Sequence, residues 1–321
     1  MDLPRVIATS VVRSSQQGES HGGVYLVDLA TGEFEQVIDW NDPLINWEGR
    51  GADRGLRGIG VSGEKVYLAA SDEIFVFDPN FLLTDSFRNP YLKHCHEVYL
   101  KDKTLYLTST GLNSILEFDI QRSSFRKGYQ ITRKEGIARA LGKLLARDEY
   151  DVRVFDASSS GGPQFNESGS NLHLNNVSYH NSAIMVSGTK IDALLEIRDD
   201  AISPCAVLPR GTHNAAIHGD GVVFNDTANS RIVVADLQAQ PILAFEVPPF
   251  DAAELTHTNI PLDHARQGFA RGLIAHGDLL IGGSSPSTIS VYSRSERRLV
   301  CSINLSKDIR NCIHGLELWP H

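Results

Sequence analysis

The chain has 321 residues, of which 41% are hydrophobic and 21% are charged, a composition typical of a globular protein with a large core. The formal net charge of −9 at pH 7 argues against nucleic acid or an anionic membrane surface as a partner. No stretch approaches the roughly 18 consecutive apolar residues of a membrane helix, and the first residues do not resemble a secretory signal. The four cysteines show no CxxC spacing, so we expect free thiols and a cytoplasmic protein.

The first elements in the chain are three predicted strands at residues 5–13, 22–30 and 33–40. A repeat then follows, in which an apolar strand, a charged turn, a second apolar strand, a polar loop and a third strand recur with a period of about 40 residues. The alternation of β-branched residues with Gly, Asp, Asn or Lys turns predicts consecutive antiparallel hairpins. Five copies of this pattern begin at Arg57, His96, Asn175, His213 and Arg271.

The C-terminal residues 311–321 contain one further first strand, around His314, with no second strand after it. Joining it to the three N-terminal strands completes a sixth copy and closes the ring, which removes the exposed edge of an open sheet. The sequence therefore predicts an all-β fold, a six-bladed β-propeller closed by one C-terminal and three N-terminal strands. It forms a single domain over residues 1–321.

Two intervals between copies are longer than the rest and predict insertions at about 132–170 and 250–270, both on the face where the channel opens. Residues 131–150 read as a short helix between blades 3 and 4, because four apolar residues recur at one-face spacing. These residues are Ile137, Leu141, Leu144 and Leu145.

The repeat resembles the six-bladed propellers of the NHL and gluconolactonase type over essentially the whole chain. The segment GFARGLIAHGDLLIGGS, residues 268–284, is also similar to a motif of a poorly characterised group of bacterial propellers. The resemblance implies the fold. The Glu, Asn and Asp residues that would bind calcium in gluconolactonase-like enzymes are not evident at matching positions, and propellers have unrelated functions.

The first residue of each innermost strand is expected to face the channel at one mouth. In blade order these ring residues are His314, Arg57, His96, Asn175, His213 and Arg271. Histidine stands on alternate blades, and three imidazoles around an axis are a ligand set for a catalytic divalent transition metal. We therefore predict that His96, His213 and His314 bind Fe, Zn, Mn or Cu.

The remaining ring residues suit a small anionic substrate. The guanidinium groups of Arg57 and Arg271 are matched to carboxylate, sulfate or phosphate, and Asn175 is expected to orient the substrate. His94 and His173 lie two residues before ring positions, which on a strand places them on the same side as the ring residue. We predict that they are catalytic, with one or the other transferring a proton, or that they are additional metal ligands nearer the mouth.

The segment before blade 2, residues 46–58, is dense in Gly, Arg and acidic residues. Within it Trp47 and Arg54 are predicted to contact the substrate. A structural loop held by salt bridges is an equally good interpretation of this segment.

These features favour a metal-dependent enzyme that acts on a small anionic molecule at the channel mouth, with lyase, hydrolase or oxygenase chemistry. Two alternatives remain open. One is a non-catalytic propeller that binds a peptide, glycan or protein partner. The other is a metal-free transferase that uses the same His and Arg residues.

Overall fold

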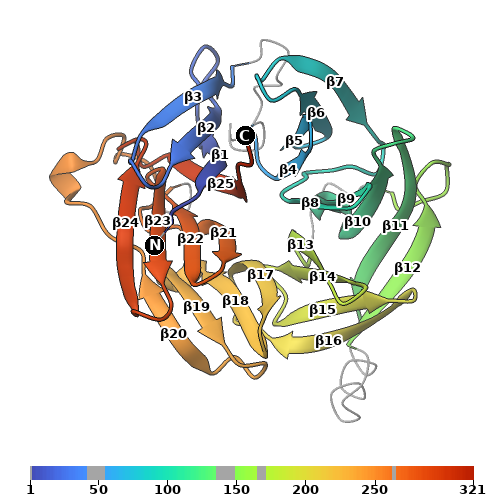
Figure 1. Ribbon diagram of the computed structural model, residues 1–321. Helices are drawn as coiled ribbons and strands as arrows, with labels where there is room; N and C mark the ends of the chain where they lie inside the picture. The colour runs from blue at the N-terminus through green and yellow to red at the C-terminus, as the bar shows by residue number, and fades with distance from the viewer. Residues whose placement is uncertain (1, 42–54, 135–148, 165–170, 262–264) are drawn as a thin grey trace.

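The computed structural model describes residues 2–41, 55–134, 149–164, 171–261 and 265–321. Six antiparallel sheets stand around a central axis like the blades of a propeller (Figure 1). The prediction of an all-β, six-bladed propeller is confirmed.

In every blade the first strand lies nearest the axis and the later strands follow outward. Blade 1 consists of β25 (Asn311–Leu318), β1 (Arg5–Val12), β2 (Gly22–Asp28) and β3 (Phe34–Asp39), and blade 2 of β4 (Ile59–Ser62), β5 (Lys65–Ala70), β6 (Glu73–Phe77) and β7 (Leu83–Arg88). Blade 3 consists of β8 (Val98–Lys101), β9 (Thr104–Ser109), β10 (Ser114–Asp119), β11 (Ser124–Arg133) and β12 (Tyr150–Asp156).

The other three blades have four strands each. Blade 4 consists of β13 (Leu174–His180), β14 (Ala183–Gly188), β15 (Ala193–Arg198) and β16 (Ala201–Val207), and blade 5 of β17 (Thr212–His218), β18 (Gly221–Asp226), β19 (Arg231–Ala235) and β20 (Pro241–Glu246). Blade 6 consists of β21 (Arg271–His276), β22 (Leu279–Ser284), β23 (Thr288–Ser293) and β24 (Arg298–Asn304). Short 3-10 turns lie at η2 (Thr110–Leu112), η3 (Thr227–Asn229) and η4 (Ala252–Glu254).

The ring closes in blade 1 as predicted. β1 pairs with β2 on one side and with the C-terminal β25 on the other, with Val6 opposite Leu318 and Val12 opposite Asn311. Because β25 covers the edge of β1 that β2 does not pair with, that edge is not exposed at the junction of the two termini.

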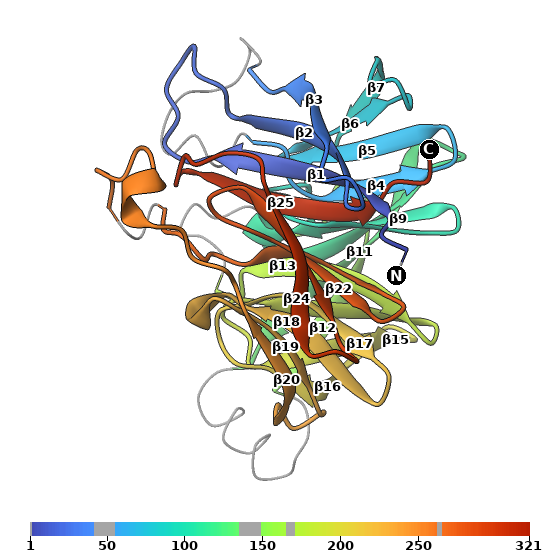
Figure 2. The same cartoon turned by 60° about the vertical axis from the view of Figure 1, so that its left-hand side comes forward.

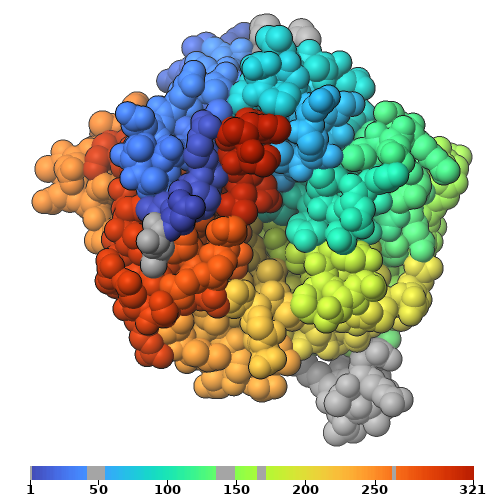
Figure 3. All heavy atoms as spheres, viewed as in Figure 1, coloured from blue at the N-terminus to red at the C-terminus, as the bar shows by residue number. Residues whose placement is uncertain are grey.

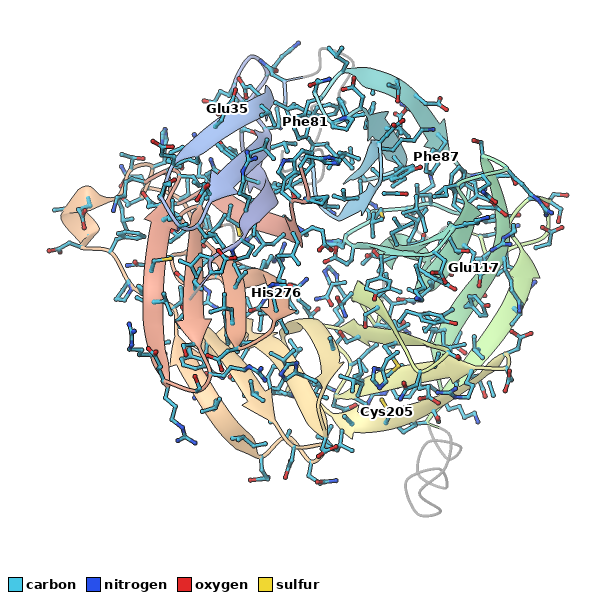
Figure 4. All side chains as sticks on the ribbon, viewed as in Figure 1. Glu35, Phe81, Phe87, Glu117, Cys205 and His276 are labelled. Atoms are coloured by element: carbon cyan, nitrogen blue, oxygen red, sulfur yellow. The ribbon has the colours of Figure 1, made fainter. Side chains whose placement is uncertain are left out.

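The core is divided among the six blade boundaries. Each of six buried apolar clusters takes its side chains from two neighbouring blades, for example Val66 and Leu68 of blade 2 with Ile7 and Val24 of blade 1. The middle strands are buried on both faces because each blade packs against two others, whereas an outer strand such as β7 is mostly exposed. Figure 4 places Glu35, Phe87 and Cys205 toward the rim and His276, at the end of β21, near the axis.

The insertion between blades 3 and 4 differs from the prediction. The described residues at its ends form strands, since β11 extends to Arg133 and β12 pairs with it as a fifth strand of blade 3. The helix was expected over residues 131–150, of which 131–133 belong to β11 and 150 to β12, while 135–148 lie outside the described residues. β11 and β12 are held together by backbone pairing between residues that are distant in the sequence, and the apolar spacing that suggested a helix did not reveal this pairing.

The second insertion contains η4, which projects from the side of the molecule on which β25 begins (Figure 2). The ring residues lie near the starts of the innermost strands, on the same side. No helix in the described part of the chain is long and apolar enough to span a membrane.

Candidate functional site

The six predicted ring residues come from six successive blades and lie at the starts of the innermost strands. His314 lies in β25, Asn175 in β13 and His213 in β17, Arg271 begins β21, and Arg57 and His96 precede β4 and β8 by two residues. Five of the six are buried and Arg271 is partly exposed. The repeat thus brings these polar side chains together in the interior of the ring.

Irregular pairing sets the direction of the ring side chains in three blades. The register between the first and second strands shifts at the ring position of blades 4, 5 and 6. In blade 5 the backbone of Asn214 is left-handed, with φ 50°, and in blade 6 that of Gly272 is left-handed, with φ 71°. An extra residue at such a point bends a strand and redirects its side chains.

Two guanidinium groups contact two imidazoles across blade boundaries. Nη1 of Arg57 lies 3.2 Å from Nε2 of His96, and Nη1 of Arg271 lies 2.7 Å from Nε2 of His314. The rings of His96 and His314, on blades 3 and 1, are 5.6 Å apart between centroids. Since a guanidinium only donates, both Nε2 atoms are acceptors and therefore carry no proton.

The tautomer of His96 is set from its other side. Its Nδ1 lies 2.9 Å from the carbonyl oxygen of His94 and 2.8 Å from Oγ1 of Thr110. The Thr110 hydroxyl donates to the carbonyl of Leu174 in the next blade. Two acceptors face Nδ1, so this nitrogen bears the proton.

His213 repeats this arrangement in blade 5. Its Nδ1 lies 2.9 Å from Oγ1 of Thr227 and 3.2 Å from the carbonyl oxygen of Gly211, and the Thr227 hydroxyl donates to the carbonyl of Ala270 over 2.7 Å. Nδ1 of His213 is therefore protonated, and in the neutral ring Nε2 has a free lone pair.

Buried polar atoms of three ring residues have no hydrogen-bond partner among the residues that the structure describes: Nε2 of His213, Oδ1 of Asn175 and Nε of Arg271. The amide of Asn175 is oriented by its Nδ2, which donates to the carbonyl of Thr212 over 3.1 Å. Buried polar groups in folded proteins are nearly always satisfied. Three such atoms in one ring indicate a place for a bound molecule or ordered water.

The electrostatics of the ring are dominated by positive charge. Burial lowers the pKa of His96, His213 and His314 well below its usual value, and the neighbouring arginines lower it further. The imidazoles are therefore neutral at pH 7. Burial also lowers the pKa of the Arg271 guanidinium, as does the charge of Arg13.

The geometry does not support a three-histidine metal centre. In the described residues, no group of three His, Cys, Asp or Glu side chains is placed to hold one metal ion. Two of the three Nε2 lone pairs, on His96 and His314, accept hydrogen bonds from guanidinium groups. A metal at this point would have to displace both arginines.

His94 and His173 occupy positions other than those expected. Both have left-handed backbone, with φ 55° and 51°, and both precede the strands β8 and β13, so strand alternation does not apply to them. His173 still reaches the ring, with its imidazole 5.1 Å from that of His96 between centroids. The backbone of His94 lies between Asp72, whose Oδ1 accepts from its N–H, and His96.

Trp47 and Arg54, the other two predicted substrate contacts, lie outside the described residues.

Sequence reasoning missed an aromatic ring surrounded by guanidinium groups. The carbons Cζ of Arg13 and Arg271 each lie 4.7 Å from the centroid of Phe269, and that of Arg266 lies 5.3 Å from it. The same phenyl ring is 5.8 Å from the imidazole of His213. Phe269 thus separates three cations that would otherwise repel one another at close range. The only signal in the sequence that could have identified Phe269 is its position two residues before the ring residue Arg271.

A second feature that sequence reasoning missed is a hydrogen bond between two blades that are not neighbours. Oε2 of Glu97 in blade 3 accepts from Nδ2 of Asn214 in blade 5 over 2.8 Å. Blade 4 lies between these two blades (Figure 1), so the hydrogen bond joins side chains from blades that are not adjacent. Asn214 is oriented by Asn225 and by the N–H of Gly272, which donate to its Oδ1 over 3.1 Å and 2.9 Å. Asn214 therefore connects blades 3 and 5 next to the ring.

The far end of the channel has a different chemistry. The space-filling view shows a hollow at the centre, where the inner strands meet (Figure 3). A hollow of about 390 Å³ there is bordered by Tyr99 and Glu317. Burial raises the pKa of Glu97 to about 8 and also raises that of Glu317. The far end thus presents the carboxyl group of Glu317, whereas the ring presents guanidinium and imidazole groups.

No protein-family model matches the chain, and no curated protein matches its sequence significantly. Among solved structures it is similar to a protein of unknown function from Bacteroides caccae, with a TM-score of 0.55 and 10% identity over 98% of each chain. The C-terminal WD40 domain of Sif2 has a TM-score of 0.51 and 9% identity, over 95% of this chain and 88% of the other. A catalytically inactive H270A virginiamycin B lyase from Staphylococcus aureus has a TM-score of 0.45 and 13% identity, over 79% and 71%. Likeness at these identities shows the propeller fold alone, so the function rests on the site.

Proposed function

We propose that the ring binds a small molecule with a carboxylate, sulfate or phosphate group and acts on it without a metal. The observation that supports this most directly is Arg271. Its guanidinium lies near Arg13 and Arg57, and among the described residues it forms no ion pair. A cation in such a place is destabilised unless an anion compensates it.

An anion would also satisfy hydrogen-bond capacity that the ring leaves unused. Nε of Arg271 is buried without an acceptor, and its Nη1 donates to the neutral imidazole of His314, a weaker acceptor than a carboxylate or phosphate oxygen. The partial exposure of Arg271 and Phe269 gives this side of the ring access from the mouth.

The same ring has a group suited to proton transfer. His213 is neutral, its protonated Nδ1 is held by Thr227 and Gly211, and its Nε2 lone pair is unused. A base held in one tautomer next to bound substrate is the arrangement of general acid–base catalysis. This favours a metal-free lyase or transferase over a passive carrier, and the structure of the ring leaves the leaving group unspecified.

Anion binding can be tested with the purified full-length chain by calorimetry and thermal shift. We expect sulfate, phosphate or acetate to bind and stabilise the protein more than chloride at equal ionic strength. Arg271→Gln should weaken binding by about tenfold or more, since a charge-assisted hydrogen bond is lost. The control is Arg298→Gln, an exposed arginine of β24 paired with Glu296. Equal anion responses in both variants would refute the proposal.

The metal-dependent enzyme predicted from the sequence and the metal-free site proposed here differ in their metal content, which can be measured. Protein purified without a His tag or chelator would be analysed by elemental mass spectrometry. If the wild type contains one equivalent of Fe, Zn, Mn or Cu and His213→Ala loses it, the metal-free proposal is refuted and the predicted metal centre is supported. A protein that takes up none of these ions on reconstitution would agree with the metal-free proposal.

The alternative of a propeller that binds a peptide, glycan or protein partner lacks a supporting surface in the described residues. The large hydrophobic side chains exposed there are scattered over outer strands and turns at the rim: Phe34, Leu82, Leu83, Val207, Ile242 and Leu299. Isolated exposed apolar residues are ordinary on a soluble protein.

A further inference from the structure

The ring has a donor side and an acceptor side. Arg57 and Arg271, on blades 2 and 6, can only donate hydrogen bonds. Blades 4 and 5 provide Oδ1 of Asn175 and Nε2 of His213, two acceptors that are buried and have no donor among the described residues. A simple anion could satisfy the first side but not the second, because it brings no hydrogen.

The two acceptors are neighbours. Nδ2 of Asn175 donates to the carbonyl of Thr212, the residue directly before His213, over 3.1 Å. A carbonyl oxygen only accepts, so this contact fixes the amide with its own oxygen unused. The contacts of Nδ1 of His213 with Gly211 and Thr227 fix the imidazole with Nε2 unused.

We infer that the ligand carries a hydroxyl group beside its anionic group. The anion binds Arg57 and Arg271, and the single hydroxyl hydrogen is shared between Nε2 of His213 and Oδ1 of Asn175 in a three-centre hydrogen bond. This inference rests on the proposed function and narrows its substrate class to short hydroxylated carboxylates, or phosphates of the same shape. An ammonium group would also donate, but it would enter a ring that already contains two guanidinium groups, with Arg13 close by. A neutral hydroxyl avoids that repulsion.

The hydroxyl should contribute strongly to affinity. A site built to hydrogen-bond a hydroxyl discriminates against the analogue without it, because the buried acceptors of the site are then left unpaired. For one or two buried neutral acceptors we expect a preference of about 10-fold to 100-fold. Once bound, the hydroxyl proton faces the free lone pair of His213, the group that we propose as the base.

The test is a comparison of ligands that differ by one hydroxyl group. Binding of glycolate and acetate, 3-hydroxypropionate and propionate, 4-hydroxybutyrate and butyrate, and 2-hydroxyethyl phosphate and ethyl phosphate would be measured by calorimetry. We expect at least one hydroxylated member to bind about tenfold or more tightly than its partner. The carboxylate and phosphate pairs identify which anionic group the ring prefers. Glycine and β-alanine serve as the amino counterparts of the first two acids.

Variants of the acceptor side localise the effect. His213→Phe and Asn175→Leu should reduce the preference for the hydroxylated member while the hydroxyl-free anions bind as before. Arg271→Gln should weaken binding of both members. If His213→Phe does not fold, Asn175→Leu and the wild-type comparison still decide the question.

Three results would overturn the inference. Equal binding within every pair refutes the hydroxyl while leaving anion binding intact. Tighter binding of the amino acids than of the hydroxy acids identifies an ammonium donor instead. No binding of any anion refutes both this inference and the proposed function.

Discussion

His213 and Thr227 form a pair that fixes the state of the imidazole: Nδ1 of His213 lies 2.9 Å from Oγ1 of Thr227, whose hydroxyl is directed to the carbonyl of Ala270 in the next blade. His96 and Thr110 form the same pair two blades away. In both cases the threonine begins a 3-10 turn between the second and third strands. One hydrogen-bond pattern thus connects neighbouring blades and determines which imidazole nitrogen faces the ring.

Replacing Thr227 tests this pair. Thr227→Val keeps the shape but removes the hydroxyl, so we expect a loss of about 1 to 2 kcal/mol in the free energy of unfolding. The fraction of His213 with its proton on Nδ1, measured by ¹⁵N NMR, should fall. Thr227→Ser retains the hydroxyl and should restore both properties. Unchanged imidazole chemical shifts in Thr227→Val would contradict the role of the hydroxyl.

The acid stability of the protein should reflect the buried histidines. The pKa of His96, His213 and His314 is lowered in the folded state, from 6.5. The unfolded chain therefore binds more protons below about pH 6.5, and stability falls as the pH decreases through this range. Urea unfolding at several pH values between 5 and 7 measures the effect. In His213→Phe the decline should be shallower than in the wild type, and an identical slope would argue against a buried neutral His213.

Glu97 predicts a pH dependence of opposite sign. Its pKa is raised from 4.5 to about 8 by burial. The folded state therefore binds more protons than the unfolded chain between these values, and its contribution to stability is lost as the pH rises from 4.5 to 8. The difference in unfolding free energy between wild type and Glu97→Gln should accordingly change with pH across this window. A difference that stays constant would show that the carboxyl titrates normally.

The closing blade is expected to be sensitive to core substitution. Ile313 on β25 is completely buried in the cluster between blades 6 and 1. Ile313→Ala should lower the free energy of unfolding by about 2 to 5 kcal/mol, because it leaves a cavity where the two termini meet. Ile242→Ala, on the exposed strand β20, is the matched control and should change it by no more than about 0.5 kcal/mol. Denaturant titration compares the two, and similar losses would mean that β25 does not secure the ring.

The sequence by itself determined the blades and the membership of the ring. Strand alternation and two-residue hairpin loops are local properties, and they recur at fixed spacing, so the six sheets, the closure by residues 311–318 and the positions of His213 and Arg271 follow from pattern alone. The local pattern was misleading where pairing partners decided the structure. Residues 150–156 form a fifth strand, β12, because their backbone pairs with β11. His173 does not have strand geometry, because its backbone is left-handed.

Only the tertiary structure decided what the ring residues contact. The hydrogen bonds of Arg57 to His96, of Arg271 to His314 and of Glu97 to Asn214 join residues that are 39, 43 and 117 positions apart. Such contacts depend on the geometry of the blades and on the rotamer of each side chain. The periodicity of the sequence determines neither of these. Three histidines on alternate blades therefore indicated a metal centre, whereas the structure sets two of them against arginines. Among the described residues no guanidinium donates to Nε2 of His213, so its lone pair is free.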